Sequence, residues 1–196
     1  EPYRSVHTCI KVTNAVFINS QSPDRSMVYS YDYLGWVDEW GYGDSTAWAA
    51  NTFTAMEGGQ LTEVGFYTND VNTTYDIYIK QGGPAGTVLY SQLGGSSLYS
   101  SRRYTGFSCL KTLGGGGVFS VVVKFTTSGH TSPIPAERVS SGYSDSAIVN
   151  AGESYMSHDG NSWTDMSTLS APSNACIKAF VEPAEEKAWT IMVYLA

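Results

Sequence analysis

Three cysteines and three histidines are the side chains in this sequence that could form a thiol-based reaction centre. A reactive thiol needs an adjacent histidine that takes its proton, and this histidine needs a third polar group that orients it. Cys9 and His7 lie together in a short terminal stretch, and Cys109 lies in a strand-like segment. Cys176 lies inside the last strand pattern of the chain. Because thiols in such places behave as small hydrophobic side chains, the sequence predicts no catalytic site.

The histidines and the longest glycine run give little support to a zinc or nucleotide site. His7, His130 and His158 lack the spacing of zinc ligands, both to one another and to the cysteines. The glycines at 114–117 are followed by Val118, and not by the Lys and Ser or Thr with which a phosphate loop begins its helix. We therefore expect solvated loop histidines and a glycine-rich hairpin.

Side chains with oxygen donors are grouped in two turns, and Ca²⁺ is the cation that such groups bind. One group consists of Asn69, Asp70 and Asn72, and the other lies within residues 38–44. Neither group has the ligand spacing of an EF-hand, so turn formation is the favoured interpretation. The sequence therefore predicts no cofactor, with a structural Ca²⁺ at Asn69, Asp70 and Asn72 as the alternative.

Aromatic side chains beside acidic ones in a glycine-rich loop are the best candidates for ligand contacts. The apolar face of a sugar ring packs on an aromatic ring, while nearby carboxylates bind the hydroxyls of the sugar. Trp40, Tyr42 and Asp44 form such a group. Aromatic residues also fill the cores of β-sandwiches, and we assign Trp36 and Trp48 to the core.

The segment SHDGNSW at residues 157–163 is similar to the Asp-box hairpin of sialidase propellers, in which the aspartate ties the turn and the aromatic residue packs below it. One copy does not make a propeller. Asp159 and Trp163 are accordingly predicted to form the turn and to pack beneath it, with direct ligand contact as the alternative.

The elements that position these residues follow from a period of two in the hydrophobic pattern. Tyr75, Ile77 and Ile79 share one face of the segment 74–80, as expected of a strand with one buried face. Further segments of this kind are residues 61–68, 87–91, 118–125, 153–157, 162–166 and 175–181. Many short strands without intervening helices predict an all-β fold, an antiparallel β-sandwich of the jelly-roll type.

Composition excludes two classes of partner. The formal charge of -7 and the isoelectric point near 4.8 argue against nucleic acid, because affinity for phosphates depends on clustered Lys and Arg. No apolar run approaches the roughly 20 residues that span a bilayer, so we expect no membrane span.

The motifs VYSYDYLGW (residues 28–36) and GYGDSTAW (residues 41–48) resemble the lectin-like domain found in bacterial and archaeal papain-like cysteine peptidases. Further segments match that family in the same order: residues 50–55, 64–68, 75–79, 119–125, 153–157 and 176–180. The resemblance covers most of the chain. Residues 14–24 resemble the joint after the last papain-like strand, and WTIMVYLA (residues 189–196) is similar to the first strand of a clostripain-like peptidase domain.

The resemblance implies four segments. They are an N-terminal flank at residues 1–26, a lectin-like β-sandwich at 27–181, a linker at 182–188 and the start of a peptidase domain at 189–196. It further implies a non-catalytic accessory module of a secreted cysteine peptidase, outside the cell or on its surface. The expected partners are a carbohydrate, cell-surface or protein ligand and the adjacent peptidase domain. The alternatives are a pro-region or inhibitory domain, cleaved in the exposed linker, and a structural spacer.

Overall fold

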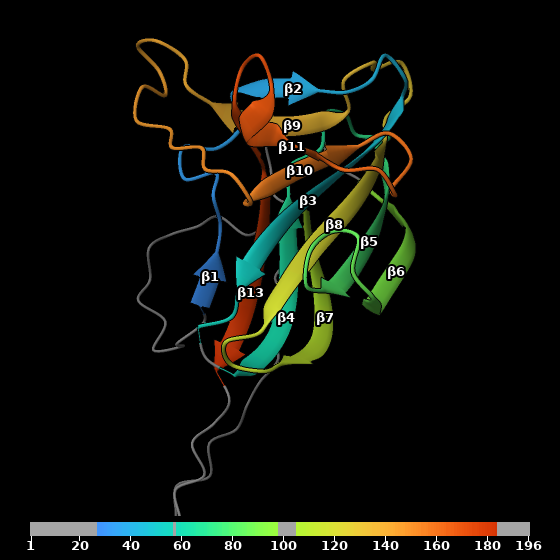
Figure 1. Cartoon of the computed structure of the whole chain (residues 1–196). Helices are drawn as coiled ribbons and strands as arrows, with labels where there is room; N and C mark the ends of the chain where they lie inside the picture. The colour runs from blue at the N-terminus through green and yellow to red at the C-terminus, as the bar shows by residue number, and fades with distance from the viewer. Residues whose placement is uncertain (1–26, 57, 98–104, 184–196) are drawn as a thin grey trace, which may run out of the picture.

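The computed structural model describes residues 27–56, 58–97 and 105–183 of the chain. Within these ranges the chain forms thirteen β-strands and one 3-10 turn, arranged in three antiparallel sheets (Figure 1). The four-stranded sheet has the order β1 (Met27–Tyr29), β13 (Ile177–Pro183), β4 (Gly59–Phe66) and β7 (Thr105–Leu113).

The six-stranded sheet has the order β11 (Thr164–Asp165), β10 (Ser154–Ser157), β3 (Thr46–Thr54), β8 (Val118–Thr126), β5 (Thr74–Gln81) and β6 (Val88–Ser96). The three-stranded sheet has the order β12 (Ser173–Ala175), β9 (Ile134–Arg138) and β2 (Asp38–Trp40), and the 3-10 turn η1 (Met166–Thr168) precedes β12. The predicted all-β antiparallel sandwich is confirmed.

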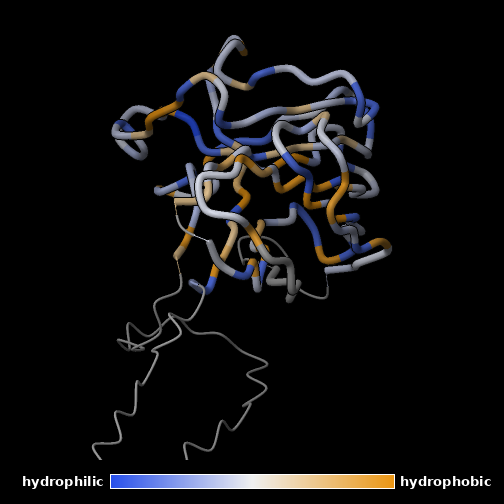
Figure 2. Tube along the Cα trace, turned by 60° about the horizontal axis from the view of Figure 1, so that its bottom comes forward, coloured by the Kyte–Doolittle hydropathy of each residue, from blue (hydrophilic) through white to orange (hydrophobic). Residues whose placement is uncertain are grey.

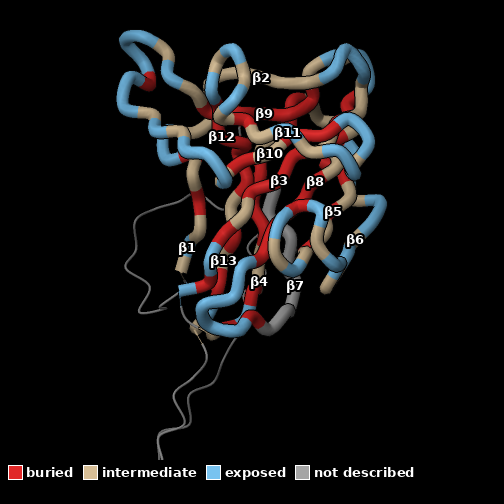
Figure 3. Tube along the Cα trace, in the orientation of Figure 1, coloured by how far each residue is buried: buried red, intermediate tan, exposed pale blue. Residues whose placement is uncertain are grey.

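The core lies between the four-stranded and six-stranded sheets. The predicted inward face of β5 is confirmed, since Tyr75, Ile77 and Ile79 are all buried. The inner face of β8 carries Phe119, Val121, Val123 and Phe125, which are likewise buried, and these two faces belong to one hydrophobic cluster. Figure 3 shows buried residues along the central strands, and Figure 2 shows the hydrophilic stretches on the loops. The alternation of apolar and polar residues along β5 and β8 therefore accounts for which of their side chains face the core.

Asn51 joins the two large sheets inside this apolar core. Its Nδ2 donates to the carbonyl oxygens of Ala175 at 3.0 Å and Ile177 at 2.8 Å, and its Oδ1 accepts from the Ser154 hydroxyl at 2.7 Å. The side chain is fully buried. These bonds satisfy backbone carbonyls at the point where the chain passes from β12 to β13.

That passage differs from the prediction of one continuous strand over residues 175–181. The chain forms β12 up to Ala175 and β13 from Ile177, in two different sheets. Cys176 lies between them, and its backbone N–H donates to the carbonyl of Pro135 at 3.0 Å. The strand also continues past the predicted linker start, because Glu182 and Pro183 pair with Gln60 and Gly59.

The assignment of Trp36 and Trp48 to the core is wrong. Both side chains are partly exposed, and neither belongs to the buried cluster between the sheets. Trp48 pairs with Lys124 of β8 and follows the buried Ala47, so it lies on the outer face of the six-stranded sheet. Trp36 has Tyr67 as its aromatic neighbour, with ring centroids 6.1 Å apart.

The predictions for residues 1–26 and 189–196 lie outside the described residues, as does the linker from residue 184 onward. Among the described residues, no helix has the length and apolar character needed to cross a bilayer.

Candidate functional site

Three of the predicted ligand-binding residues meet at one end of the sandwich, where the loop after β2 approaches the β10–β11 hairpin. Tyr42 and His158 place their ring centroids 5.2 Å apart. The Nε2 atom of His158 lies 2.8 Å from Oδ2 of Asp44. Tyr42 is 40% exposed, and burial of the rest of the side chain raises its pKa. The result is an accessible aromatic ring with an imidazole and a carboxylate beside it, which we call the Tyr42 cluster (Tyr42, Asp44, His158 and Asp159).

Asp159 forms the turn of the hairpin with its own carboxylate. Its Oδ1 accepts the backbone N–H groups of Asn161 and Ser162, each at 2.8 Å, and the hydroxyl of Ser157 at 3.0 Å. These donors, the Ser162 and Asn161 N–H groups foremost, lower the pKa of Asp159 to about 2. The exposed carboxylate therefore carries a full negative charge at neutral pH, and its second oxygen has a 3.4 Å contact from Ser162 Oγ.

The β10–β11 hairpin packs against the ring of Trp48. A Cβ atom added to Gly160 would lie only 2.9 to 3.0 Å from atoms of the Trp48 ring, so the glycine backbone packs directly against the indole. Lys124 Nζ lies 5.5 Å from the centroid of the same ring, within cation–π range. Tyr78 of β5 adds a further aromatic contact, with centroids 5.5 Å apart. The position of His158 and Asp159 thus depends on packing by the sheet.

Trp163 lies partly buried beside the same face of the sheet. Lys80 Nζ lies 5.9 Å from the centroid of its ring and donates to the carbonyl of Pro84 at 2.7 Å. Burial lowers the pKa of Lys80. The indole N–H of Trp163 is buried and has no hydrogen-bond partner among the described residues. These contacts fit the predicted packing role beneath the turn, and ligand contact by Trp163 stays a prediction.

Trp40 lies in the scaffold beneath the loop. It packs against the hydrophobic core, and its indole N–H donates to the hydroxyl of Ser173 at 2.9 Å. It pairs with Ile134 across β2 and β9. Trp40 therefore fixes the start of the loop that carries Tyr42 and Asp44.

Asn69, Asp70 and Asn72, the residues of the alternative calcium site, lie in the turn between β4 and β5. Asp70 accepts the N–H of Val71 through Oδ1, and its Oδ2 lies 3.7 Å from Nε2 of His130. Asn69 donates to the carbonyl of Ser132 at 2.9 Å, and its buried Oδ1 has no hydrogen-bond partner within the described ranges. In the described part of the chain, no group of three or more His, Cys, Asp and Glu side chains could hold a metal. A calcium-dependent rise in melting temperature is the measurement that would assign a cation to this turn.

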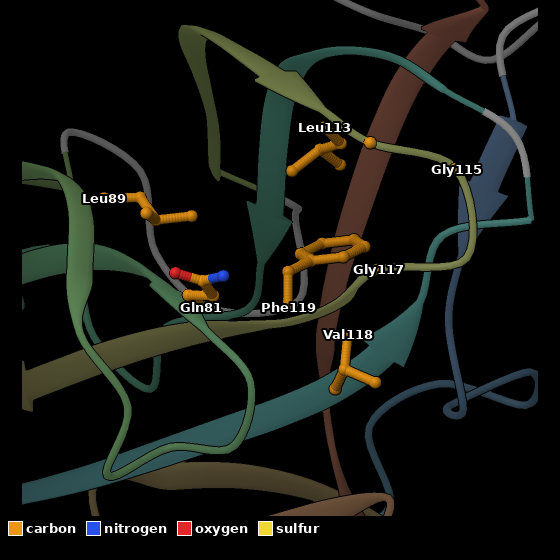
Figure 4. A pocket seen from close by; sticks show the side chains of 8 residues that line it. Gln81, Leu89, Leu113, Gly115, Gly117, Val118 and Phe119 are labelled. Atoms are coloured by element: carbon orange, nitrogen blue, oxygen red, sulfur yellow. The ribbon is translucent and has the colours of Figure 1, made fainter.

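A cavity of about 310 Å³ lies between the sheets beside the glycine-rich β7–β8 hairpin (Figure 4). Leu89, Leu113 and Phe119 give it apolar walls, and Gln81 contributes an amide. None of its described lining residues has an ionisable side chain, and none belongs to the Tyr42 cluster. This cavity can hold apolar groups but supplies no acid, base or nucleophile.

His158 is the member of the cluster that sequence reasoning treated as a solvated loop residue. Its partners Asp44 and Tyr42 are more than 100 positions away in sequence, so no local spacing reveals the contact. The available signal was its place in the hairpin motif next to Asp159.

Comparison with known proteins identifies the family of the chain. A family model described as a lectin like domain matches residues 28–181. The Clostridial cysteine protease Cwp84 after propeptide cleavage has a similar structure, with a TM-score of 0.66 and 25% identity over 83% of this chain and 41% of that chain. A structure of the cysteine protease and lectin-like domains of Cwp84, a surface layer associated protein of Clostridium difficile, gives a TM-score of 0.62 and 23% identity, covering 83% and 37%.

The chain spans about two fifths of the length of these protease structures. No curated protein sequence matches it. The family match covers the described sandwich almost from its first strand to its last, and the chain belongs to the lectin-like domain family.

Proposed function

We propose that this chain is a non-catalytic accessory module of a secreted cysteine peptidase and that its Tyr42 cluster binds saccharide at a cell surface. The observation that carries the proposal is the half-exposed ring of Tyr42 flanked by Asp44 and His158. A pyranose ring can pack on the phenol face while the carboxylates and the imidazole bind its hydroxyl groups. The hairpin that carries His158 and Asp159 packs on Trp48, so little ordering of these two residues is needed when the ligand binds.

The chemistry of the buried thiol supports a non-catalytic role. Cys176 is 1% exposed, and burial raises its pKa well above the ordinary value, with the nearby Asp32 and Glu137 carboxyls adding to the shift. A thiol in this position stays protonated and does not meet a substrate. Peptide cleavage by the parent protein is accordingly assigned to a domain other than the sandwich.

The similarity to Cwp84 supports the location of the module and the kind of protein that contains it. That protein is a cysteine protease associated with a surface layer, and it contains a lectin-like domain. By analogy the parent of this chain is a cysteine peptidase located outside the cell or on its surface. The clostripain-like identity of the segment after the sandwich, residues 189–196, belongs to the same proposal.

Binding to a glycan array and to isolated cell-wall polysaccharide tests the proposal. Tyr42→Ala is expected to abolish retention, because it removes the stacking surface and leaves the sheets untouched. Tyr143→Ala is the matched control, since Tyr143 is an exposed tyrosine, 69% accessible, on a different loop. Equal retention of the two variants, or no retention of the unmodified chain on any saccharide, would contradict the proposal.

A second candidate function is packing on the adjacent peptidase domain, and one surface favours it. Five exposed apolar residues lie on two loops, at residues 32–36 and 139–150: Tyr33, Leu34, Val139, Tyr143 and Ile148. The buried Asn174 holds these loops together, because its Nδ2 donates to the carbonyls of Tyr31 and Ile148 at 3.1 and 2.8 Å.

A hollow of about 250 Å³ lies within this surface, lined by Arg138, Val139, Ala147, Val149, Ala171 and Pro172. Exposed apolar groups next to such a hollow are typical of contact with another protein domain. The test is Tyr143→Glu with Ile148→Glu in the full-length peptidase. Faster proteolytic separation of the two domains is expected, with unchanged glycan retention.

The pro-region and spacer interpretations make different predictions for the same protein. A pro-region added in trans suppresses the cognate peptidase, whereas a spacer affects neither activity nor retention on surfaces. Suppression in trans would replace the accessory role with an inhibitory one.

A further inference from the structure

A buried lysine and aspartate connect the first and last strands of the domain, β1 and β13, which are neighbours in the four-stranded sheet. Lys178 lies in β13, and Asp32 follows β1, which pairs with β13 through Tyr29 and Ala179. The Nζ atom of Lys178 lies 3.1 Å from Oδ1 of Asp32. The Asp32 side chain is fully inaccessible, and the Lys178 side chain is 15% exposed. The amine and the carboxyl are therefore in direct contact and largely removed from water.

Ser30 bridges the two groups. Its hydroxyl oxygen lies 2.6 Å from Nζ of Lys178 and donates to Oδ1 of Asp32 at 2.8 Å. The lysine ammonium also donates to the backbone carbonyl of Asp32 at 3.1 Å. A proton can therefore pass from Nζ to Oδ1 through one hydroxyl, without any bulk water.

A second carboxyl, that of Glu137, holds the turn that carries Asp32. Glu137 is 1% exposed, and its Oε2 accepts the N–H groups of Leu34 and Gly35, the latter at 3.0 Å. Burial raises the pKa of Glu137, and the Asp32 charge raises it further. The nearby Cys176 thiol stays protonated because burial raises its pKa, so it does not compete with the amine. Glu137 thus lies close enough to Asp32 and Lys178 for both charges to affect its pKa.

We propose that Lys178 and Asp32 condense to an amide that covalently joins the first and last strands of the domain. In water an ammonium and a carboxylate are strongly hydrated, and this hydration opposes condensation. Inside the fold both ions have lost most of that hydration, so conversion to a neutral amide relieves the cost of burying charge. Holding the amine within 3.1 Å of a carboxyl oxygen replaces a bimolecular reaction by a unimolecular one.

The condensation balances without an added reagent. A proton passes from Nζ to the Asp32 carboxylate through the Ser30 hydroxyl, which gives a neutral amine and a neutral acid. The Nζ lone pair attacks Cγ and forms the Nζ–Cγ bond. The Cγ–OH bond then breaks, and the hydroxide leaves with the second proton of Nζ as one water molecule. No atom is oxidised or reduced, and the product is an uncharged secondary amide.

Glu137 acts as a positioning residue for this step. Its hydrogen bonds to Leu34 and Gly35 fix the turn after Asp32, so it affects the reaction through the position of the Asp32 carboxyl. Glu137→Gln keeps an acceptor oxygen for these N–H groups, and Glu137→Ala does not. The Ala variant is expected to slow amide formation in freshly refolded protein, and the Gln variant is expected to restore it.

The decisive experiment is the intact mass of the folded full chain, measured after denaturation and reduction. The expected mass is lower than the sequence mass by one water molecule. Succinimide formation at Asp159 and Gly160 causes the same loss, so the position must be mapped by trypsin. Acylated Lys178 is not cleaved, and the expected product is residues 26–80 joined to residues 139–187.

Lys178→Arg and Asp32→Ala are expected to have the full sequence mass. Lys124→Arg is the control, since it replaces a lysine paired with Asp76 at 3.7 Å on the outer face, and it should retain the water loss. The cross-linked peptide of the unmodified chain shows whether the amide forms, even if a variant fails to fold. A folded chain of full sequence mass, with trypsin cleavage after Lys178, would overturn the proposal.

Discussion

Gly160 is the contact through which the β10–β11 hairpin rests on the six-stranded sheet, and its replacement by alanine tests how the candidate site is held. The backbone at Gly160 has φ +75°, and an added Cβ would come within 2.9 Å of the Trp48 ring. Gly116, in the β7–β8 hairpin, has nearly the same φ of +73° but nothing within 4 Å of its Cβ position. The two glycines therefore differ in packing and hardly at all in φ.

The expected loss in the free energy of unfolding follows from this difference in packing. Alanine in the left-handed region costs about 1–2 kcal/mol at either position. At Gly160 the methyl group must also displace the Trp48 ring or the hairpin, and overpacking of this kind costs about 1–3 kcal/mol. Gly160→Ala is therefore expected to lower the free energy of unfolding by about 1–3 kcal/mol more than Gly116→Ala.

Urea unfolding followed by tryptophan fluorescence measures both variants under the same conditions, and an unchanged m-value would show that the extent of unfolding is comparable. Gly160→Ala should also weaken any ligand retention that depends on Tyr42, because the shift moves His158. Equal loss of stability in the two variants, to within about 0.5 kcal/mol, would show that the hairpin does not rest on Trp48.

Three further predictions concern the buried and titrating groups. Asn51→Ala should lower the free energy of unfolding by about 3 kcal/mol or more, because it removes three buried hydrogen bonds, two to backbone carbonyls and one from the Ser154 hydroxyl; a loss below about 1 kcal/mol in urea unfolding would contradict this. Asp159 has a pKa of about 2 in the folded chain and 3.8 ordinarily, so its contribution to stability is present above pH 4 and lost as the pH falls toward 2. Melting curves of Asp159→Asn should show a smaller loss across that window. Burial raises the pKa of Tyr31 to about 12, so its contribution is complete below pH 10 and lost as the pH rises toward 12; Tyr31→Phe should flatten this alkaline loss.

The core-facing residues of the sandwich could be predicted because apolar and polar residues alternate along its central strands. In β5 every second residue from Tyr75 to Ile79 is buried, and the alternate residues Asp76, Tyr78 and Lys80 face outward. Such a pattern has one arrangement that removes apolar area from water, and a shift of one residue would expose all of it. The prediction of these faces therefore needed no tertiary information.

The third sheet could not be predicted in the same way. Its strands β2 and β12 have three residues each, too few for a period to emerge. The break at Cys176 interrupts a pattern that continues through Ala175, Ile177 and Ala179, and it depends on a hydrogen bond to Pro135, which lies far away in sequence. Tertiary contacts here override the local pattern.

Three residues of the candidate site were chosen from the sequence, and the residue that supports its hairpin was misassigned. Tyr42, Asp44 and Asp159 were chosen for their residue types and turn chemistry, and the structure brings them to one cluster. Trp48 was misassigned because large aromatic side chains are expected in the core, whereas β3 turns the small Ala47 and Ala49 inward. The partner strands of β3 determine which of its two faces points toward the core.

The outward placement of Trp48 explains a feature of the neighbouring strand. Val122 lies on the outer face of β8, away from the core between the sheets, yet it is fully buried, as is its partner Ala50 in β3. Such burial requires a second layer over the sheet, and the rings of Trp48 and Tyr78, in contact with each other, contribute to it. The hairpin that carries His158 packs on this layer through Gly160. The hairpin residues of the candidate site, His158 and Asp159, are therefore positioned by apolar packing before a ligand arrives, and binding energy is not spent on ordering them.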